Sequence, residues 1–233
     1  MTGTLYGVGV GPGDPELITL KAARLIQGAT TVAYPTLAGG DSFARAIAAD
    51  LISDGVREIR MDVPMTTDRA PAQAAYDLGA TDIAGILDTG EDVICLCEGD
   101  PFFYGSFMYL NARLTGKYPV KVIPGVTSVT ACAAVSGRPL VARNERLTVL
   151  PGPMDAAELR DRIAGAEAVA IMKVGRHLPK IRAVIDALGL TEKATYIERA
   201  TLPEQVVLPL AQAPEKAPYF SMILLTKGAD PWL

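Results

Sequence analysis

Short apolar runs alternate along the chain with stretches in which apolar residues recur at helical spacing. The runs predict strands, and the spaced stretches predict helices. The expected strands are Leu5–Val10, Thr30–Tyr34, Asp92–Cys97, Val120–Ile123, Leu147–Leu150, Ala168–Met172, Ala194–Glu198 and Phe220–Thr226. The expected helices are Asp14–Gln27, Ser42–Ile52, Pro71–Leu87, Met108–Leu114, Thr127–Val135, Ala156–Ile163 and Leu178–Leu188.

This alternation predicts an α/β protein with largely parallel sheets. The number of strands favours two α/β domains with a cleft between them. The turn-forming segment Thr115–Pro119 is the best candidate for a linker. We therefore expect an N-terminal domain at 1–116 and a C-terminal domain at 117–233.

Composition narrows the class of protein. The 233 residues are 49% hydrophobic and 21% charged, with a net charge of −4, which argues against nucleic acid as a partner. No apolar stretch approaches the roughly 20 residues of a membrane span, and the start of the chain does not resemble a signal peptide. Cys95, Cys97 and Cys132 with one histidine make no convincing zinc site. Cys95 and Cys97 lie two apart in a predicted strand and are expected to be buried, and the expected location is a reducing cytoplasm.

The glycine-rich segment at 7–14 resembles two nucleotide-binding loops and satisfies neither. In the dinucleotide pattern G-x-G-x-x-G, the third glycine position is Pro12 when counted from Gly7, and Asp14 when counted from Gly9. No Gly-Lys-Ser/Thr follows, as a P-loop requires. An anion would meet the Asp14 carboxylate, so this loop is expected to pack closely beside a ligand that is not a phosphate.

Three further loops follow predicted strands, where open α/β sheets bind ligands. In the turn from Glu98 to Gly105, two close carboxylates can raise one pKa and yield a base, although Asp-Pro capping of a helix is the simpler interpretation. The turn Pro124–Ser128 either caps a helix or binds a ligand. The turn Lys173–His177 belongs to a group of cations that suggests an anionic ligand: Arg138, Arg143, Arg146, Lys173, Arg176, His177 and Arg199. Each alone is typical of a solvated surface charge.

Five motifs in these positions resemble the tetrapyrrole methyltransferases, which use S-adenosylmethionine. They are GVGPGDPELITLKA, EGDPFFYGSFMYL, VIPGVTSVTACAAVSGRPL, MKVGRH and IERATLPEQ. Two segments are most similar to the precorrin-2 C20-methyltransferase subfamily: EGDP, where many members carry GGDP, and YFSMILLTKG near the end. The resemblance implies two α/β domains of the class III methyltransferase fold, an active site in the interdomain cleft, and a homodimer.

The resemblance also implies site residues. Contacts to the methyl donor are expected from Pro12, Gly99, Asp100, Pro101, Phe103, Tyr104, Ser106, Thr127, Ser128, Met172, Ala200, Leu225 and Thr226. The tetrapyrrole carries a rim of carboxylates, which the cations are expected to bind. The expected substrate contacts are Arg138, Arg143, Arg146 and Arg176.

The implied reaction methylates the C20 meso carbon of precorrin-2 and needs neither a metal nor a covalent nucleophile. Asp100 is the first candidate for removing the proton from that carbon, or for orienting the macrocycle, and Glu98 is the second. Methylation of cobalt-precorrin-2, or of uroporphyrinogen III, is the closest alternative. A tetrapyrrole carrier without catalysis is a more distant one, and Pro12 and Asp14 disfavour an NAD-dependent oxidoreductase.

Overall fold

The computed structural model describes residues 1–37, 40–64 and 69–228, which form two compact units, Met1–Thr127 and Ser128–Leu233. The expected boundary after residue 116 differs from this division. The reason is that β5 (Val120–Ile123) pairs in parallel with β1 (Leu5–Gly9), so the segment Thr115–Pro119 lies within the first unit. In the described ranges, no helix has the length and apolar character needed to cross a membrane.

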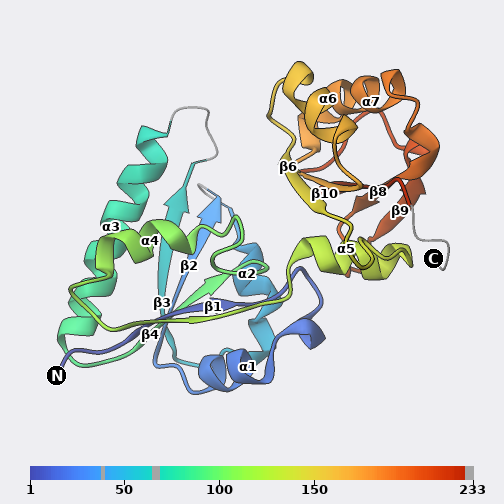
Figure 1. The fold of residues 1–233 in the computed structure, drawn as a ribbon. Helices are drawn as coiled ribbons and strands as arrows, with labels where there is room; N and C mark the ends of the chain where they lie inside the picture. Colours follow the sequence, from blue (N-terminus) through green and yellow to red (C-terminus); the bar gives the residue numbers. More distant parts are fainter. Residues whose placement is uncertain (38–39, 65–68, 229–233) are drawn as a thin grey trace. The chain divides into compact units, whose positions relative to one another are not determined.

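The first unit is a parallel five-stranded sheet with helices on both faces (Figure 1). The strand order is β3 (Arg57–Val63), β2 (Thr31–Leu37), β4 (Val93–Cys97), β1 and β5. The helices are α1 (Leu20–Gln27), α2 (Phe43–Ile47), α3 (Ala70–Asp88) and α4 (Phe107–Leu114). A 3-10 turn at Pro15–Leu17 precedes α1, and a second at Ala49–Leu51 follows α2. These turns divide the two longer helices expected there.

Side chains of β4 alternate between two cores, as a strand covered on both faces requires. Cys95 and Cys97 pack with α3 and α4, whereas Ile94 and Leu96 pack with α1 and α2. All three cysteines are buried, and for Cys95 and Cys97 this confirms the prediction from the sequence. Burial raises the pKa of the Cys97 thiol to about 11 and that of Cys132 to about 12, which is typical of unreactive core cysteines.

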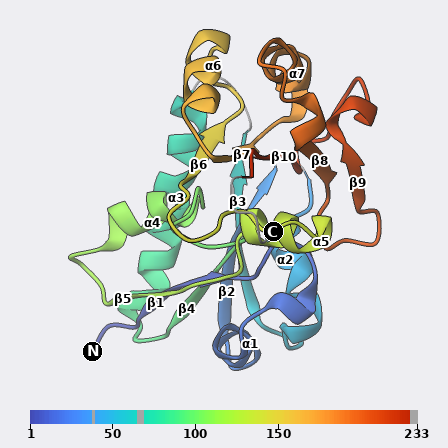
Figure 2. The same cartoon turned by 45° about the vertical axis from the view of Figure 1, so that its right-hand side comes forward.

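The second unit is a mixed sheet rather than the parallel sheet expected from the alternation. Its order is β6 (Leu147–Pro151), β7 (Ala168–Met172), β10 (Ser221–Thr226), β8 (Ala194–Glu198) and β9 (Val206–Pro209). β6 and β7 are parallel, but β10 runs antiparallel to both β7 and β8. Figure 2 shows the same order of strands, from β6 to β9. Helices α6 (Ala156–Ala164) and α7 (Leu178–Ala187) cover one face, and α5 (Ser128–Ser136) contacts β8 and β10.

The carboxyl ends of β4, β1 and β5 are joined by contacts between glycine main chains. Gly11 and Gly99 exchange two backbone hydrogen bonds, of 3.3 and 2.8 Å. A Cβ atom at Gly9 would lie 2.6 Å from the Gly125 nitrogen, and a Cβ at Gly125 would lie 2.0 Å from the Gly99 oxygen. Neither position has room for a side chain. We call this contact of Gly9, Gly11, Gly99 and Gly125 the glycine junction.

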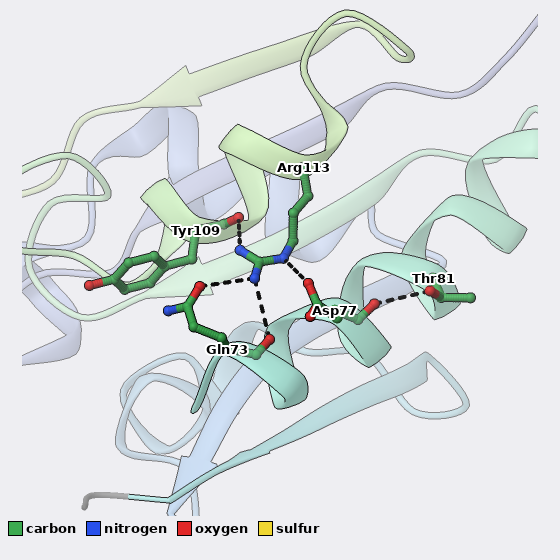
Figure 3. Close-up of polar contacts among 5 residues, drawn as sticks. All are labelled: Gln73, Asp77, Thr81, Tyr109 and Arg113. Atoms are coloured by element: carbon green, nitrogen blue, oxygen red, sulfur yellow. Dashed lines mark hydrogen bonds and ion pairs between the residues drawn. The ribbon is translucent and has the colours of Figure 1, made fainter. Parts of the chain in front are cut away.

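Arg113 ties α4 to α3 (Figure 3). Its guanidinium donates to an Asp77 carboxylate oxygen at 2.6 Å, to the Tyr109 carbonyl at 2.9 Å and to the Gln73 side-chain oxygen at 3.0 Å. The arginine side chain is 21% exposed, so water competes little for these donors. Since α4 begins at Phe107, just after the turn at 98–105, this clamp also fixes the end of that turn.

We expect Arg113→Ala to lower the free energy of unfolding by about 1–2 kcal/mol, because acceptors on two helices, part-buried at Gln73 and Tyr109, lose a charged donor. Urea unfolding followed by circular dichroism measures the change. The matched control is Arg162→Ala, whose exposed pair with Glu158 spans 3.5 Å and contributes close to nothing. Equal stability of the two variants would contradict the role of the clamp.

Gly125→Ala should cost about 3 kcal/mol or more, because the new methyl group must displace the Gly99 carbonyl. Gly85→Ala on α3 is the control: nothing lies within 4 Å of its added Cβ. Alanine there should be neutral or raise stability by about 1 kcal/mol, since it favours the helix. A Gly125→Ala protein as stable as the parent, in the same urea series, would show that the junction is not closely packed.

Candidate functional site

Three of the predicted ligand loops lie at one edge of the first sheet. They follow β1, β4 and β5, which are neighbours and run parallel, so their carboxyl ends meet. The glycine junction holds the three loops together. Asp14, within the first loop, accepts a hydrogen bond from the Glu16 nitrogen at 2.8 Å and caps the 3-10 turn. Pro12 lies between this cap and the junction.

The Asp100 carboxylate holds loop backbone in place. One of its oxygens accepts from the nitrogens of Phe102 at 2.9 Å and Phe103 at 3.1 Å. The other accepts from the Gly125 nitrogen at 3.1 Å. Asp100 therefore ties the turn after β4 to the turn after β5, and three main-chain donors occupy its lone pairs. This arrangement suits a positioning role better than that of a proton acceptor.

Glu98 occupies the position directly after β4, one residue before Gly99 of the junction. Its side chain is largely removed from water, and this burial raises the pKa of its carboxyl group to about 7. Glu98 is therefore close to half protonated near neutral pH. Such a carboxyl group is suited to accepting a proton and releasing it again.

The turn after Asp100 presents aromatic side chains. Phe102 is 52% exposed and Tyr104 is 44% exposed, while Phe103 lies edge-on to Tyr104 at 5.3 Å between ring centroids. The backbone of Tyr104 has a φ of 58°, a conformation that costs a non-glycine residue free energy. The predicted contacts Pro101 and Ser106 belong to the same turn, and Thr127 and Ser128 follow Gly125 at the start of α5.

The second sheet has a comparable edge where β7 and β8 end. Lys173 directly follows β7 with a φ of 57°, and Arg199 and Thr201 follow β8 with φ of 46° and 73°. With Tyr104, these account for four of the five non-glycine residues of positive φ among the residues described. Backbone strain of this kind gathers at binding sites. Met172 and Ala200, two predicted donor contacts, lie at this edge.

The antiparallel direction of β10 moves two predicted donor contacts away from that edge. Leu225 pairs with Val169 and Thr226 pairs with Ala168, at the beginning of β7 rather than at its end. Leu225 is also completely buried. The residues of the last strand that reach the edge are instead those at its start, because Ser221 pairs with Glu198.

The four predicted substrate arginines have different surroundings. Arg176 is exposed in the turn after β7, at the edge just described, and Arg143 lies in an exposed loop with a φ of 47°. Arg138 donates to the Thr195 hydroxyl at 3.2 Å. Arg146 precedes β6 at the opposite edge and forms a two-pronged pair with Glu167, at 3.1 and 2.7 Å. This hydrogen bonding lowers the pKa of the Glu167 carboxyl group to about 2.

The chemistry of these loops fits a cationic methyl donor better than a phosphate ligand. Asp14, Glu98 and Asp100 give the first edge an acidic character, which suits the sulfonium and ammonium groups of S-adenosylmethionine. The glycine junction leaves main-chain atoms, rather than side chains, to surround a ligand there. Among the described residues, no cluster of three or more His, Cys, Asp or Glu side chains is placed to hold a metal ion.

Tyr219 and Phe220 are residues at the second edge that the sequence did not single out as site residues. They are 50% and 40% exposed and immediately precede β10. Two adjacent aromatic residues before an apolar strand were the available signal. It could be interpreted only once the direction of β10 was known.

Comparison with known proteins identifies the family. Residues 4–214 match the model for Tetrapyrrole (Corrin/Porphyrin) Methylases. The precorrin-2 C(20)-methyltransferase of a Sinorhizobium species is 43% identical, over 98% of this chain and 97% of that protein. The cobalt-precorrin-2 C(20)-methyltransferase of Salmonella typhimurium is 31% identical, over 97% and 98%.

A solved structure supports the same family. The uroporphyrin-III C-methyl transferase of Thermus thermophilus, complexed with S-adenyl homocysteine, superposes with a TM-score of 0.69. It is 27% identical, and the match covers 95% of this chain and 97% of that one. The motifs, the two α/β units and the full-length similarity thus agree, and this chain belongs to the tetrapyrrole methylase family.

Proposed function

We propose that this protein transfers a methyl group from S-adenosylmethionine to C20 of precorrin-2, giving precorrin-3A in cobalamin biosynthesis. The observation that carries the proposal is the 43% identity, over nearly the full length of both chains, with a relative named for that reaction. The EGDP turn supports the proposal, because EGDP in place of GGDP resembles the same subfamily.

When bound, S-adenosylmethionine supplies an electrophilic methyl group. The donor contacts that we propose are Pro12, Gly99, Asp100, Pro101, Phe103, Tyr104, Ser106, Thr127, Ser128, Met172 and Ala200. Leu225 and Thr226 are left out because the β10 register places them at the other edge of the second sheet. The presence of S-adenyl homocysteine in the Thermus relative supports the same donor here.

The substrate carbon determines what the protein must do besides positioning. A meso carbon that forms a bond to the incoming methyl group still carries its hydrogen, and conjugation returns only when that proton leaves. We propose Glu98 as the acceptor, in place of Asp100, the first candidate from the sequence. The carboxyl group of Glu98 has a pKa near neutrality and makes no side-chain hydrogen bond or ion pair with the described residues, whereas Asp100 accepts from three main-chain nitrogens.

The proposed roles of the remaining residues follow from their positions. Asp100 keeps the turns after β4 and β5 in register, and so orders the donor contacts next to Glu98. Arg138, Arg143 and Arg176 are proposed to pair with carboxylates of the macrocycle. Arg146 is left out because Glu167 already satisfies it at the opposite edge. The homodimer and the cytoplasmic location stay predictions.

Cobalt-precorrin-2 is the second candidate substrate, supported by the 31% identical Salmonella relative. The higher identity with the Sinorhizobium protein favours the metal-free macrocycle. Uroporphyrinogen III is favoured less, because the Thermus relative is 27% identical.

The purified protein, given methyl-labelled S-adenosylmethionine under nitrogen, should label precorrin-2 once, and nuclear magnetic resonance should place the label at C20. Parallel incubations contain cobalt-precorrin-2 and uroporphyrinogen III. Faster labelling of either parallel substrate, or a label at another carbon, would contradict the proposed reaction. Calorimetry with S-adenosylhomocysteine tests the donor site separately from the chemistry.

Glu98→Gln should lower kcat roughly 10²- to 10⁴-fold while the affinity for S-adenosylhomocysteine stays within a few-fold. In the parent protein, kcat should rise as pH rises through about 7, because only the deprotonated carboxylate accepts a proton. Single-turnover rates across pH 5.5–8.5 measure this effect. A parental pH profile preserved in the Gln variant would exclude Glu98 as the acceptor.

Stability supplies an independent check on Glu98. A carboxyl group whose pKa is raised by folding contributes most below its unfolded pKa, and that contribution is lost as pH rises through about 7. Glu98→Gln removes this dependence, so the variant should gain stability relative to the parent over that window. Asp100→Asn is the matched variant: it places an amide against the Gly125 nitrogen and should weaken donor binding and stability together.

A further inference from the structure

The exposed aromatic rings in the part of the chain that the structure describes lie in two places. Within the described ranges, four aromatic side chains are more than 36% exposed: Phe102, Tyr104, Tyr219 and Phe220. The first two lie in the turn after β4, at the edge that carries the glycine junction. The other two lie at the start of β10, at the edge where β7 and β8 end. Exposure of apolar rings to water is unfavourable and often marks a binding site, so this distribution favours a ligand at the second edge as well.

The backbone around Tyr219 and Phe220 is held from both sides. The Phe220 carbonyl accepts from the Arg199 nitrogen at 2.9 Å, which ties it to the turn after β8. The Ser221 hydroxyl donates to the Pro218 carbonyl at 2.7 Å and accepts from the Gly175 nitrogen at 3.3 Å, which ties the same segment to the turn after β7. The two rings stand edge to face, 5.2 Å apart. Their position is therefore defined by both turns.

Cationic residues belong to the two turns that hold the pair. The Arg199 nitrogen donates to the Phe220 carbonyl, and Lys173 and Arg176 flank Gly175, whose nitrogen donates to the Ser221 hydroxyl. His177 follows in that turn, and its pKa is lowered by burial and by Lys180 and Arg176. The acidic group facing this edge is Glu198, which accepts a hydrogen bond from the Tyr196 hydroxyl.

We propose that Tyr219 and Phe220 form a contact surface for the face of the tetrapyrrole macrocycle, with Arg176 and Arg199 directed at its rim carboxylates. The choice of a tetrapyrrole as the ligand rests on the proposed function. A conjugated ring system packs well on aromatic side chains, and guanidinium groups bind carboxylates in forked pairs. Adenine carries no negative charge and would therefore give these cations no charge partner. A macrocycle with a carboxylate rim matches both features.

The test compares the double variant Tyr219→Ala/Phe220→Ala with the parent protein. Affinity for precorrin-2 is measured by absorbance titration under nitrogen, and affinity for S-adenosylhomocysteine by calorimetry. We expect precorrin-2 to bind roughly tenfold more weakly or worse, by analogy with bases stacked on aromatic side chains. The affinity for S-adenosylhomocysteine should remain within about twofold of the parent value.

Three further variants keep the result interpretable. The exchange Tyr219→Phe/Phe220→Tyr retains both rings and should bind precorrin-2 like the parent. Leu78→Ala, at a 70% exposed position on α3, removes apolar surface elsewhere and should change neither affinity. If the double alanine variant does not fold, Phe220→Leu keeps the apolar bulk without the ring and carries the same expectation.

Unchanged precorrin-2 affinity in a folded variant without the rings overturns the contact surface. A loss confined to S-adenosylhomocysteine also overturns it, since the donor would then be the occupant. If the parent binds precorrin-2 without transferring a methyl group, the proposed function fails while the titrations still decide this inference. A parent protein that does not bind precorrin-2 overturns both.

Discussion

The close approach of bare main chain at the glycine junction is the constraint on which the first edge depends. A Cβ atom at Gly9 or at Gly125 would clash with main-chain atoms of the neighbouring loops, so this close approach requires glycine at both positions. The junction fixes where three loops leave the sheet. Asp100 adds one hydrogen bond to the Gly125 nitrogen across the same gap and two within its own turn. Ordered loops allow a ligand to be held through backbone atoms without a cost in loop entropy at binding.

The same packing explains why two neighbouring carboxyl groups differ. Asp100 accepts hydrogen bonds from three main-chain nitrogens of the two turns, which engage both of its carboxylate oxygens. Glu98 lies one residue beyond a strand that is buried on both faces, and burial disfavours its charged form. We therefore propose separate roles for the two acids, positioning for Asp100 and proton transfer for Glu98. The sequence alone shows only that both are present.

The sequence predicts apolar strands well. Ala168–Met172 and Ala194–Glu198, inside the second sheet, have the same bounds in the structure as in the pattern, and so does the edge strand Val120–Ile123. The two strands that it missed, β3 and β9, are edge strands. β3 carries four charged residues in seven, and β9 has four residues ending in proline, so neither has the continuous apolar run of a buried strand. Edge strands are protected by this kind of composition, which hides them from a hydrophobicity pattern.

Strand direction is the other property that local sequence does not encode, and here it changes the site. A helix–strand alternation suggests parallel strands, but the connection to β10 comes after β9 and a 3-10 turn rather than a helix. β10 can therefore enter between β7 and β8 in the opposite sense. Its end then lies with the beginnings of its neighbours, which removes Leu225 and Thr226 from the donor contacts. Its beginning lies beside the turns at Lys173 and Arg199. Tyr219 and Phe220 open the YFSMILLTKG motif, but the sequence alone assigns them no site role, and only the direction of β10 brings them to the edge where we propose a ligand contact.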